Sequence, residues 1–170
     1  LPKTAKGKKV FIEFEGVRQG ADFYLNGKHI GLHENGVMAV GFDLTPYLNF
    51  TGENVIAVRT DNDWKYKERA TGSRYQWNDN NFNVNYGGIP KNVWLHITDK
   101  LYQTLPLYSN LRTTGVYIYA TDICTKSRKA FVNAESEVRN EYDKSCNVSY
   151  EVCVYDYDGN WVSTFKSAPV

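Results

Sequence analysis

Apolar and polar residues alternate at the start of the chain. Val10, Ile12 and Phe14 alternate with Phe11, Glu13 and Glu15, and Gly16 ends the run. A period of two is typical of a strand that buries one of its faces. The pattern therefore predicts a strand over residues 10–15, with Val10, Ile12 and Phe14 in the core and the other three on the opposite face.

A second alternating run leads into the strongest local signal of the chain. Ala21, Phe23 and Leu25 alternate with polar or half-polar residues, and Asn26-Gly27 follows at once. An Asn-Gly pair tolerates the positive φ angles of a type I′ turn, which joins two antiparallel strands. Residues 21–33 are therefore predicted to form a β-hairpin.

Three further elements follow from local patterns. Residues 55–59 and 93–98 have the composition of strands, and Val93, Leu95 and Ile97 share one face of the second. The pair Thr45-Pro46 predicts a short helical turn over residues 42–48, with Asp43 or Thr45 as its N-cap.

A long segment without period lies between those two strands. Residues 63–86 combine several aromatic side chains with many asparagines. Connections longer than about 12–15 residues without secondary structure are usually functional or disordered. Because aromatic residues disfavour disorder, we expect this segment to be ordered by packing.

The last third of the chain changes character. Residues 102–115 are typical of a connector between domains. Strands are expected at 116–119, 130–138 and 148–155, and Asp158-Gly159 predicts a second hairpin. This makes roughly four strands, whereas an immunoglobulin-like sandwich has about seven. We therefore expect the second domain to be incomplete.

Composition excludes several classes of function. The chain has 170 residues, 42% hydrophobic residues and a net charge of +1, with basic residues opposed by 19 acidic ones, so we expect a folded domain that does not bind nucleic acid. No apolar run is long enough to span a bilayer, and no signal peptide is expected in this segment. The three cysteines, at 124, 146 and 153, lack the spacing of a metal site.

Most candidate catalytic groups have a simpler structural explanation. Glycosidases need two carboxyl groups across the bond. Glu13 with Glu15, and Glu135 with Glu137, lie at strand spacing, but opposite the apolar face, where solvated carboxylates are common. The histidines His29, His33 and His96 are expected on strands, so no metal ligands are expected. Nucleophile elbows and phosphate loops are also not found.

The segment 63–86 points to carbohydrate recognition. Aromatic faces stack on sugar rings, and amide and carboxylate groups hydrogen-bond hydroxyl groups. The alternative is that Trp64, Trp77 and Phe82 only bury the segment against its sandwich or a neighbouring domain.

Several motifs in a consistent order resemble those of the family 2 glycoside hydrolases, which include β-galactosidases. The resemblance rests on Phe14-Glu15-Gly16-Val17, Ala21-Asp22-Phe23-Tyr24-Leu25-Asn26-Gly27 with Ile30-Gly31, Phe42-Asp43-Leu44-Thr45-Pro46-Tyr47-Leu48, Asn54-Val55-Ile56-Ala57-Val58-Arg59 with Asp61-Asn62, and Gly87-Gly88-Ile89 with Asn92-Val93-Trp94-Leu95. It is close over residues 8–98 and looser from Gly115. Pro90-Lys91 departs from the family, which has an aromatic residue and an arginine there.

The resemblance implies an all-β chain. A jelly-roll, galactose-binding-like β-sandwich over residues 1–104 is expected to precede a partial, truncated immunoglobulin-like β-sandwich over residues 105–170. In this family the catalytic glutamates lie on a TIM barrel, which we expect to be missing here. The segment is then non-catalytic scaffold of a β-galactosidase-like retaining enzyme, without a cofactor, in a periplasmic or extracellular setting.

The resemblance also implies a substrate contact. In some members a carboxylate or amide before the Gly-Gly-Ile strand touches the terminal sugar, and the matching residues are Asp79, Asn83 and Asn85, with Trp77 beside them. Two rival functions are an independent carbohydrate-binding module and a structural or adhesive β-sandwich. We further expect self-association through residues 116–162, since an incomplete sandwich exposes strand edges and apolar faces.

Overall fold

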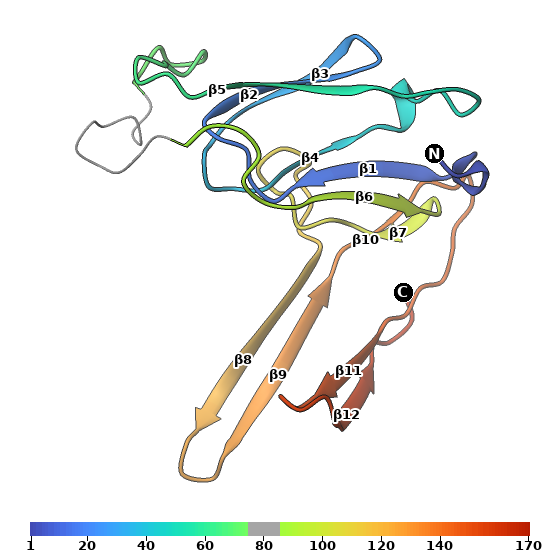
Figure 1. Cartoon of the computed structure of the whole chain (residues 1–170). Helices are drawn as coiled ribbons and strands as arrows, with labels where there is room; N and C mark the ends of the chain where they lie inside the picture. Colours follow the sequence, from blue (N-terminus) through green and yellow to red (C-terminus); the bar gives the residue numbers. More distant parts are fainter. Residues whose placement is uncertain (75–85) are drawn as a thin grey trace. The chain divides into compact units, whose positions relative to one another are not determined.

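The computed structural model describes residues 1–74 and 86–170. Among these residues the structure is all-β, with strands and two short 3-10 turns (Figure 1). The chain forms two compact units. The first comprises Leu1–Asp99 with Leu107–Arg112, and the second comprises Lys100–Pro106 with Thr113–Val170. The predicted all-β class is confirmed.

The first unit is a sandwich of two antiparallel three-stranded sheets, which face each other in Figure 1. One sheet has the order β4-β1-β6, with β4 at Val40–Asp43, β1 at Lys9–Phe14 and β6 at Val93–Thr98. The other has the order β3-β2-β5, with β3 at Lys28–Glu34, β2 at Gly20–Leu25 and β5 at Ile56–Asp61. The 3-10 turns η1 and η2 span Lys3–Ala5 and Thr45–Tyr47. The second contains Pro46 as predicted, but it is shorter than the expected 42–48, and its N-cap is Leu44, without a side-chain hydrogen bond, in place of Asp43 or Thr45.

The predicted hairpin joins β2 to β3. Asn26 and Gly27 have φ angles of 51° and 78°, the left-handed values that the turn needs. The Asn26 side chain also accepts a hydrogen bond from the Val55 backbone N–H at 2.9 Å and donates to Asn54 at 2.9 Å. This asparagine therefore shapes the turn and ties it to the chain just before β5.

Apolar side chains from both sheets meet between them. Val10, Ile12 and Phe14 of β1 and Ala21, Phe23 and Leu25 of β2 are buried. The Phe23 ring lies between Phe14 and Phe42, with ring centroids 5.0 and 4.7 Å away. Period-two alternation thus identified the core faces of both strands.

Phe11 departs from the alternation. It was expected on the outer face of β1, but only 6% of it is exposed. The Lys9 ammonium lies 5.5 Å from its ring centroid. On β4, a Cβ at Gly41 would collide with Leu107, so this leucine packs closely against the same sheet. The alternation predicts which face of a strand a side chain points to, but not whether another segment of the chain covers that face.

The predicted connector contributes to the first sandwich. The Asn110 side-chain amide donates to the Gly41 carbonyl and its oxygen accepts the Gly41 N–H at 3.3 Å, while the Ser109 hydroxyl donates to the Ala39 carbonyl at 3.3 Å. Residues 107–112 therefore satisfy backbone groups at the outer edge of β4, where a further strand would otherwise pair.

The second unit contains three two-stranded antiparallel sheets. They pair β7 (Leu101–Gln103) with β10 (Val138–Asn140), β8 (Val116–Cys124) with β9 (Lys129–Ser136), and β11 (Glu151–Tyr155) with β12 (Trp161–Lys166). The predicted second hairpin joins β11 to β12, where Asp156 accepts backbone N–H groups of Asp158 and Asn160 and Gly159 has a φ of 83°. Many apolar side chains of this unit, Tyr117, Phe131 and Trp161 among them, are exposed.

None of the helical segments among residues 1–74 and 86–170 is long and apolar enough to cross a membrane.

Candidate functional site

The candidate site lies on the long connection between β5 and β6. The predicted sugar-contacting residues Trp77, Asp79, Asn83 and Asn85 lie outside the described residues, which end at Arg74 and resume at Tyr86. The structure does describe both flanks of this connection. These flanks show how the sandwich holds the two ends of the connection.

Both ends of the connection attach to the same short stretch of chain. The Arg18 N–H donates to the Gly88 carbonyl at 2.9 Å and the Gly88 N–H donates to the Arg18 carbonyl at 3.1 Å. The neighbouring Gln19 N–H donates to the carbonyl of Asp61, the last residue of β5, at 3.1 Å. The connection is therefore closed at its base by backbone hydrogen bonds.

The first flank, residues 63–74, is fastened to the outer face of the β3-β2-β5 sheet. The Tyr66 hydroxyl donates to a Glu34 carboxylate oxygen at 2.6 Å, and the same oxygen accepts the Arg69 backbone N–H at 2.9 Å. The Tyr66 ring lies so close to Gly20 that a Cβ there would overlap it. Burial and the hydrogen bond to Glu34 raise the pKa of Tyr66, so the phenol stays protonated and donates.

Asp22 provides the second anchor of this flank. Its side chain is buried, and its two oxygens accept hydrogen bonds from the Arg69 guanidinium at 2.9 and 2.5 Å. His29, across the hairpin, lies 3.0 Å from the same carboxylate. The hydrogen bonds from Arg69 lower the pKa of Asp22, which keeps it ionised. A two-oxygen pairing of this kind fixes orientation as well as distance.

These anchoring residues were not predicted from the sequence. The signal that could have pointed to them is Asp22 itself, a carboxylate in the middle of an otherwise apolar and aromatic strand. Its partner Arg69 lies 47 residues further along the chain, in a segment without period. Only the fold could bring the two together.

We expect the Asp22 anchor to fail in acid. Because the pKa of Asp22 is lowered on folding, its contribution to stability is fully present above the ordinary value of 3.8 and is lost as the pH falls from there through the lowered pKa of the folded chain. At pH 7, Asp22→Asn should lower the free energy of unfolding of the chain by about 1–2 kcal/mol, a modest value because the guanidinium is half exposed. Urea unfolding at pH 7 and at pH values below 3.8 measures this.

Glu68 is a half-buried residue whose carboxylate accepts a local hydrogen bond from Thr71, and it gives the matched control Glu68→Gln. This variant should change stability by less than about 0.5 kcal/mol at either pH. A deficit of Asp22→Asn that persisted in acid would contradict an ionic anchor.

The other candidate carboxylates have structural partners. Glu13 lies 2.9 Å from His96, and Glu15 accepts a hydrogen bond from the Trp94 indole at 2.9 Å. Glu137 accepts the Thr114 backbone N–H at 2.6 Å, and Glu135 accepts from the Tyr119 hydroxyl at 3.2 Å. Hydrogen bonds from Trp94 and Thr114 lower the pKa of Glu15 and of Glu137 respectively.

The histidines are likewise accounted for. His29 and His96 pair with the carboxylates of Asp22 and Glu13. His33 is buried against the Met38 carbonyl, and this burial lowers its pKa. In the described part of the chain, no group of three or more His, Cys, Asp or Glu side chains could hold a metal ion.

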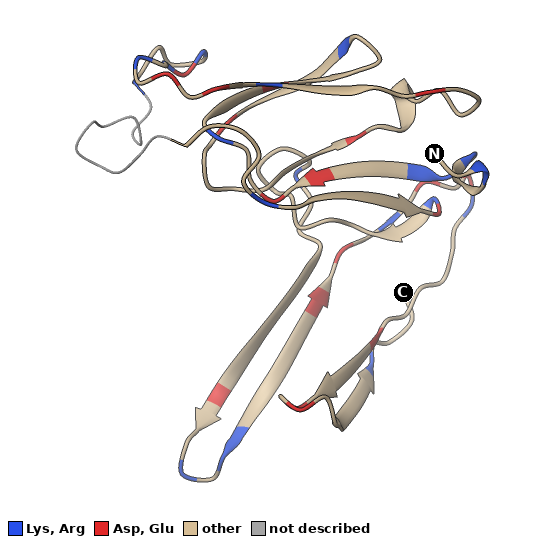
Figure 2. Ribbon diagram, viewed as in Figure 1, with Lys and Arg blue, Asp and Glu red and all other residues tan. Residues whose placement is uncertain are grey.

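Charge is distributed evenly over the described ribbon. Figure 2 shows acidic and basic residues interspersed along the strands and turns. Charge therefore singles out no patch of the described ribbon as a binding surface.

Comparisons with known proteins identify the family. The family model described as "Glycosyl hydrolase 2 galactose-binding domain-like" matches residues 1–95. The chain is 46% identical over 159 residues to a β-glucuronidase of Formosa agariphila, covering 94% of this chain and 16% of that protein. It is 29% identical over 168 residues to a β-galactosidase of Bacteroides ovatus, covering 99% of this chain and 17% of that protein.

A solved structure gives the same result. The structure of a β-glucuronidase from glycoside hydrolase family 2 superimposes with a TM-score of 0.84 at 42% identity, covering 100% of this chain and 18% of that one. The chain thus spans less than a fifth of the length of these relatives. The match of the family model over more than half of the chain, together with the galactose-binding-like sandwich, shows that the chain belongs to the glycosyl hydrolase 2 galactose-binding domain-like family.

Proposed function

We propose that this chain is the non-catalytic amino-terminal part of a longer family 2 glycosidase that hydrolyses a β-glucuronide or a β-galactoside. The observation that carries the proposal is the 46% identity over nearly the whole chain with a β-glucuronidase of which it makes up only 16%. Both β-glucuronidases and β-galactosidases are found among the relatives, so we propose one of these two sugars in the substrate of the longer enzyme.

The ionisation of four described carboxyl groups supports a non-catalytic role. A retaining glycosidase needs two carboxyl groups about 5–5.5 Å apart, one of them held protonated as the acid. Glu15, Asp22, Glu137 and Asp156 each have a lowered pKa, in each case chiefly through hydrogen bonds from N–H groups. Such groups are held ionised, the opposite of what a general acid requires.

In this proposal the catalytic carboxylates lie on a barrel elsewhere in the polypeptide, and the sandwich contributes contacts at the rim of the sugar pocket. Trp77 would stack on the sugar, and Asp79, Asn83 and Asn85 would hydrogen-bond its hydroxyl groups. The anchoring of the first flank by Glu34 and Asp22 supports this role, since substrate contacts need a fixed base.

Kinetics of the longer enzyme test the proposal. With p-nitrophenyl β-D-glucuronide and p-nitrophenyl β-D-galactoside, the ratio of kcat/KM values identifies the sugar. Asn83→Ala should raise KM about 2- to 10-fold with a smaller change in kcat, because a lost hydrogen bond to substrate costs about 0.5–1.5 kcal/mol.

Asn147→Ala, at an exposed position in the second unit, is the matched control and should leave both constants unchanged. Equal KM values for wild type, Asn83→Ala and Asn85→Ala would reject the rim contact. Failure of the longer enzyme to cleave either substrate would reject the glycosidase proposal for these two sugars.

Two further expectations stay predictions. We also propose that the chain divides into two domains at residue 104 and that the second domain, residues 105–170, is immunoglobulin-like. We propose self-association through residues 116–162 as well, for which the exposed Tyr117, Phe131 and Trp161 would supply apolar surface.

A further inference from the structure

Arg18 places a charged group partly out of water without a partner for it. The residue lies just before β2 and is half-buried, and its Nε is shielded from solvent. Within residues 1–74 and 86–170, this Nε has no hydrogen-bond acceptor. A buried N–H without an acceptor costs free energy, and more so when it belongs to a charged group. Such a group in a folded protein indicates an acceptor that comes from outside the described chain.

Other arginines of the first sandwich show the contrast. The Arg69 guanidinium donates to both carboxylate oxygens of Asp22. The Nε of Arg74 donates to the Trp64 carbonyl at 3.3 Å. Both of these side chains are used to hold the first flank of the long connection. Arg18 lies close to the same connection, but its side chain is left available for a ligand.

The position of Arg18 is well defined by its backbone and by a close glycine contact. Its N–H and carbonyl are both hydrogen-bonded to Gly88, at the second end of the long connection. A Cβ at Gly36, in the loop 35–39 between β3 and β4, would lie 3.4 Å from the Nε of Arg18. The guanidinium therefore packs against this loop, and its residue is tied to the chain three positions after the proposed sugar contact Asn85.

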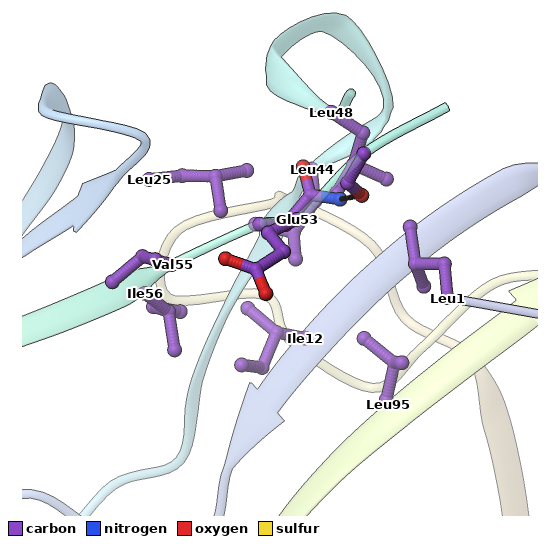
Figure 3. Close-up of a pocket in the computed structure, with 11 residues that line it drawn as sticks. Leu1, Ile12, Leu25, Leu44, Leu48, Glu53, Val55, Ile56 and Leu95 are labelled. Carbon is purple, nitrogen blue, oxygen red and sulfur yellow. Dashed lines mark hydrogen bonds between the residues drawn. The ribbon is translucent and has the colours of Figure 1, made fainter. Parts of the chain in front are cut away.

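The apolar groove of the first sandwich offers no comparable group. It has a volume of about 660 Å³ and lies beside Leu25, at the other end of β2 from Arg18. Figure 3 shows Leu25, Ile56 and Leu95 around it, together with the Glu53 carboxylate. Among the described residues that line the groove, Glu53 has the only charged side chain. An apolar lining with a carboxylate suits neither an anionic ligand nor a sugar rich in hydroxyl groups.

We propose that Arg18 binds the carboxylate of a β-glucuronide substrate in the longer enzyme. The inference rests on the proposed function and selects one of its two sugars, because a glucuronide carries a carboxylate where a galactoside carries a hydroxymethyl group. The planar guanidinium matches a carboxylate through two parallel hydrogen bonds. Since its Nε has already lost contact with water, this guanidinium gives up less hydration on binding than an exposed arginine does.

The similarity to known enzymes agrees with this choice of sugar. The chain is 46% identical to a β-glucuronidase over 159 residues and 29% identical to a β-galactosidase over 168 residues. An arginine that reads the carboxylate would make the amino-terminal sandwich a determinant of specificity as well as a scaffold.

Calorimetric titration of the longer enzyme with glucuronate and with glucose tests the inference. The two ligands differ only in the carboxylate that replaces a hydroxymethyl group. Arg18→Gln should weaken the binding of glucuronate roughly 10- to 100-fold, as expected for hydrogen bonds to a charged group, and leave the affinity for glucose unchanged. Arg18→Lys should recover only part of the loss, because an ammonium keeps the charge but not the paired donors.

Arg128→Gln removes an exposed arginine of the second unit and is the matched control, which should bind both ligands as the wild type does. Unchanged affinity of Arg18→Gln for glucuronate would overturn the proposal. Equal weakening of glucuronate and glucose would also overturn it, because Arg18 would then support the site without contacting the carboxylate.

Binding does not depend on hydrolysis, so the two proposals can fail separately. A longer enzyme that cleaves neither chromogenic substrate, but binds glucuronate through Arg18, would reject the proposed function and keep the carboxylate contact. One that hydrolyses the galactoside, and binds glucuronate no more tightly than glucose, would keep the proposed function and overturn this inference.

Discussion

The 170-residue chain alone is expected to leave p-nitrophenyl β-D-glucuronide and p-nitrophenyl β-D-galactoside at their uncatalysed rates of hydrolysis. The longer enzyme is expected to accelerate one of them by at least about 10⁶-fold, the lower end of what enzymes achieve. In the described chain, hydrogen bonds lower the pKa of Glu15 and of Glu137 and keep both ionised, whereas the reaction needs a protonated acid beside a nucleophile. Release of p-nitrophenol by equal molar amounts of the two proteins measures it.

Hydrolysis by the chain alone, abolished by Glu13→Gln or Glu15→Gln, would contradict this expectation and return the carboxylate pair at the end of β1 to the catalytic role. A sugar titration separates the rival functions. A scaffold gives no saturable change in tryptophan fluorescence with galactose, lactose or glucuronate. An independent carbohydrate-binding module gives a saturable change that Asn83→Ala or Asn85→Ala removes.

Phe23→Ala should produce the largest loss of stability. The Phe23 side chain is fully buried and contacts Phe14 of β1 and Phe42 of β4, so it joins the two sheets. Removing such a ring costs the transfer free energy of its atoms together with the cavity left behind, about 3–5 kcal/mol. Urea unfolding of the chain, followed by circular dichroism, gives the change in free energy of unfolding.

Val37→Ala is the matched control, because Val37 is 60% exposed and truncation there should cost less than about 0.5 kcal/mol. Phe23→Leu should recover part of the loss, since it retains most of the apolar volume. A loss below about 1 kcal/mol for Phe23→Ala would mean that the two sheets do not depend on this packing.

The local elements of the first sandwich could be predicted from residue order. The hairpin around Asn26-Gly27 depends on backbone angles that those two residues tolerate, and the core faces of β1 and β2 follow from side chains alternating across a strand. The family could also be predicted, because several short motifs stand in a consistent order over the part of the chain that the family model matches.

The candidate site was only partly predictable. Its place on the connection between β5 and β6 followed from an aromatic, asparagine-rich segment too long for an ordinary loop. The proposed contacts Trp77, Asp79, Asn83 and Asn85 stay predictions. The anchors Asp22 and Glu34 were missed because their partners Arg69 and Tyr66 are 47 and 32 residues away in sequence, and no local pattern encodes such a distance.

Sequence by itself determined the features that depend on near neighbours: strand periodicity, the Asn-Gly turn, the turn at Pro46 and the ordered family motifs. Only the tertiary structure decided which faces and edges are covered. It buries Phe11 on a face predicted to be outer, uses Asn110 to cover the edge of β4, and leaves Leu95 and Ile56 beside an open groove. The physical reason is that periodicity sets the direction of a side chain, whereas burial depends on what distant segments of the chain place against it.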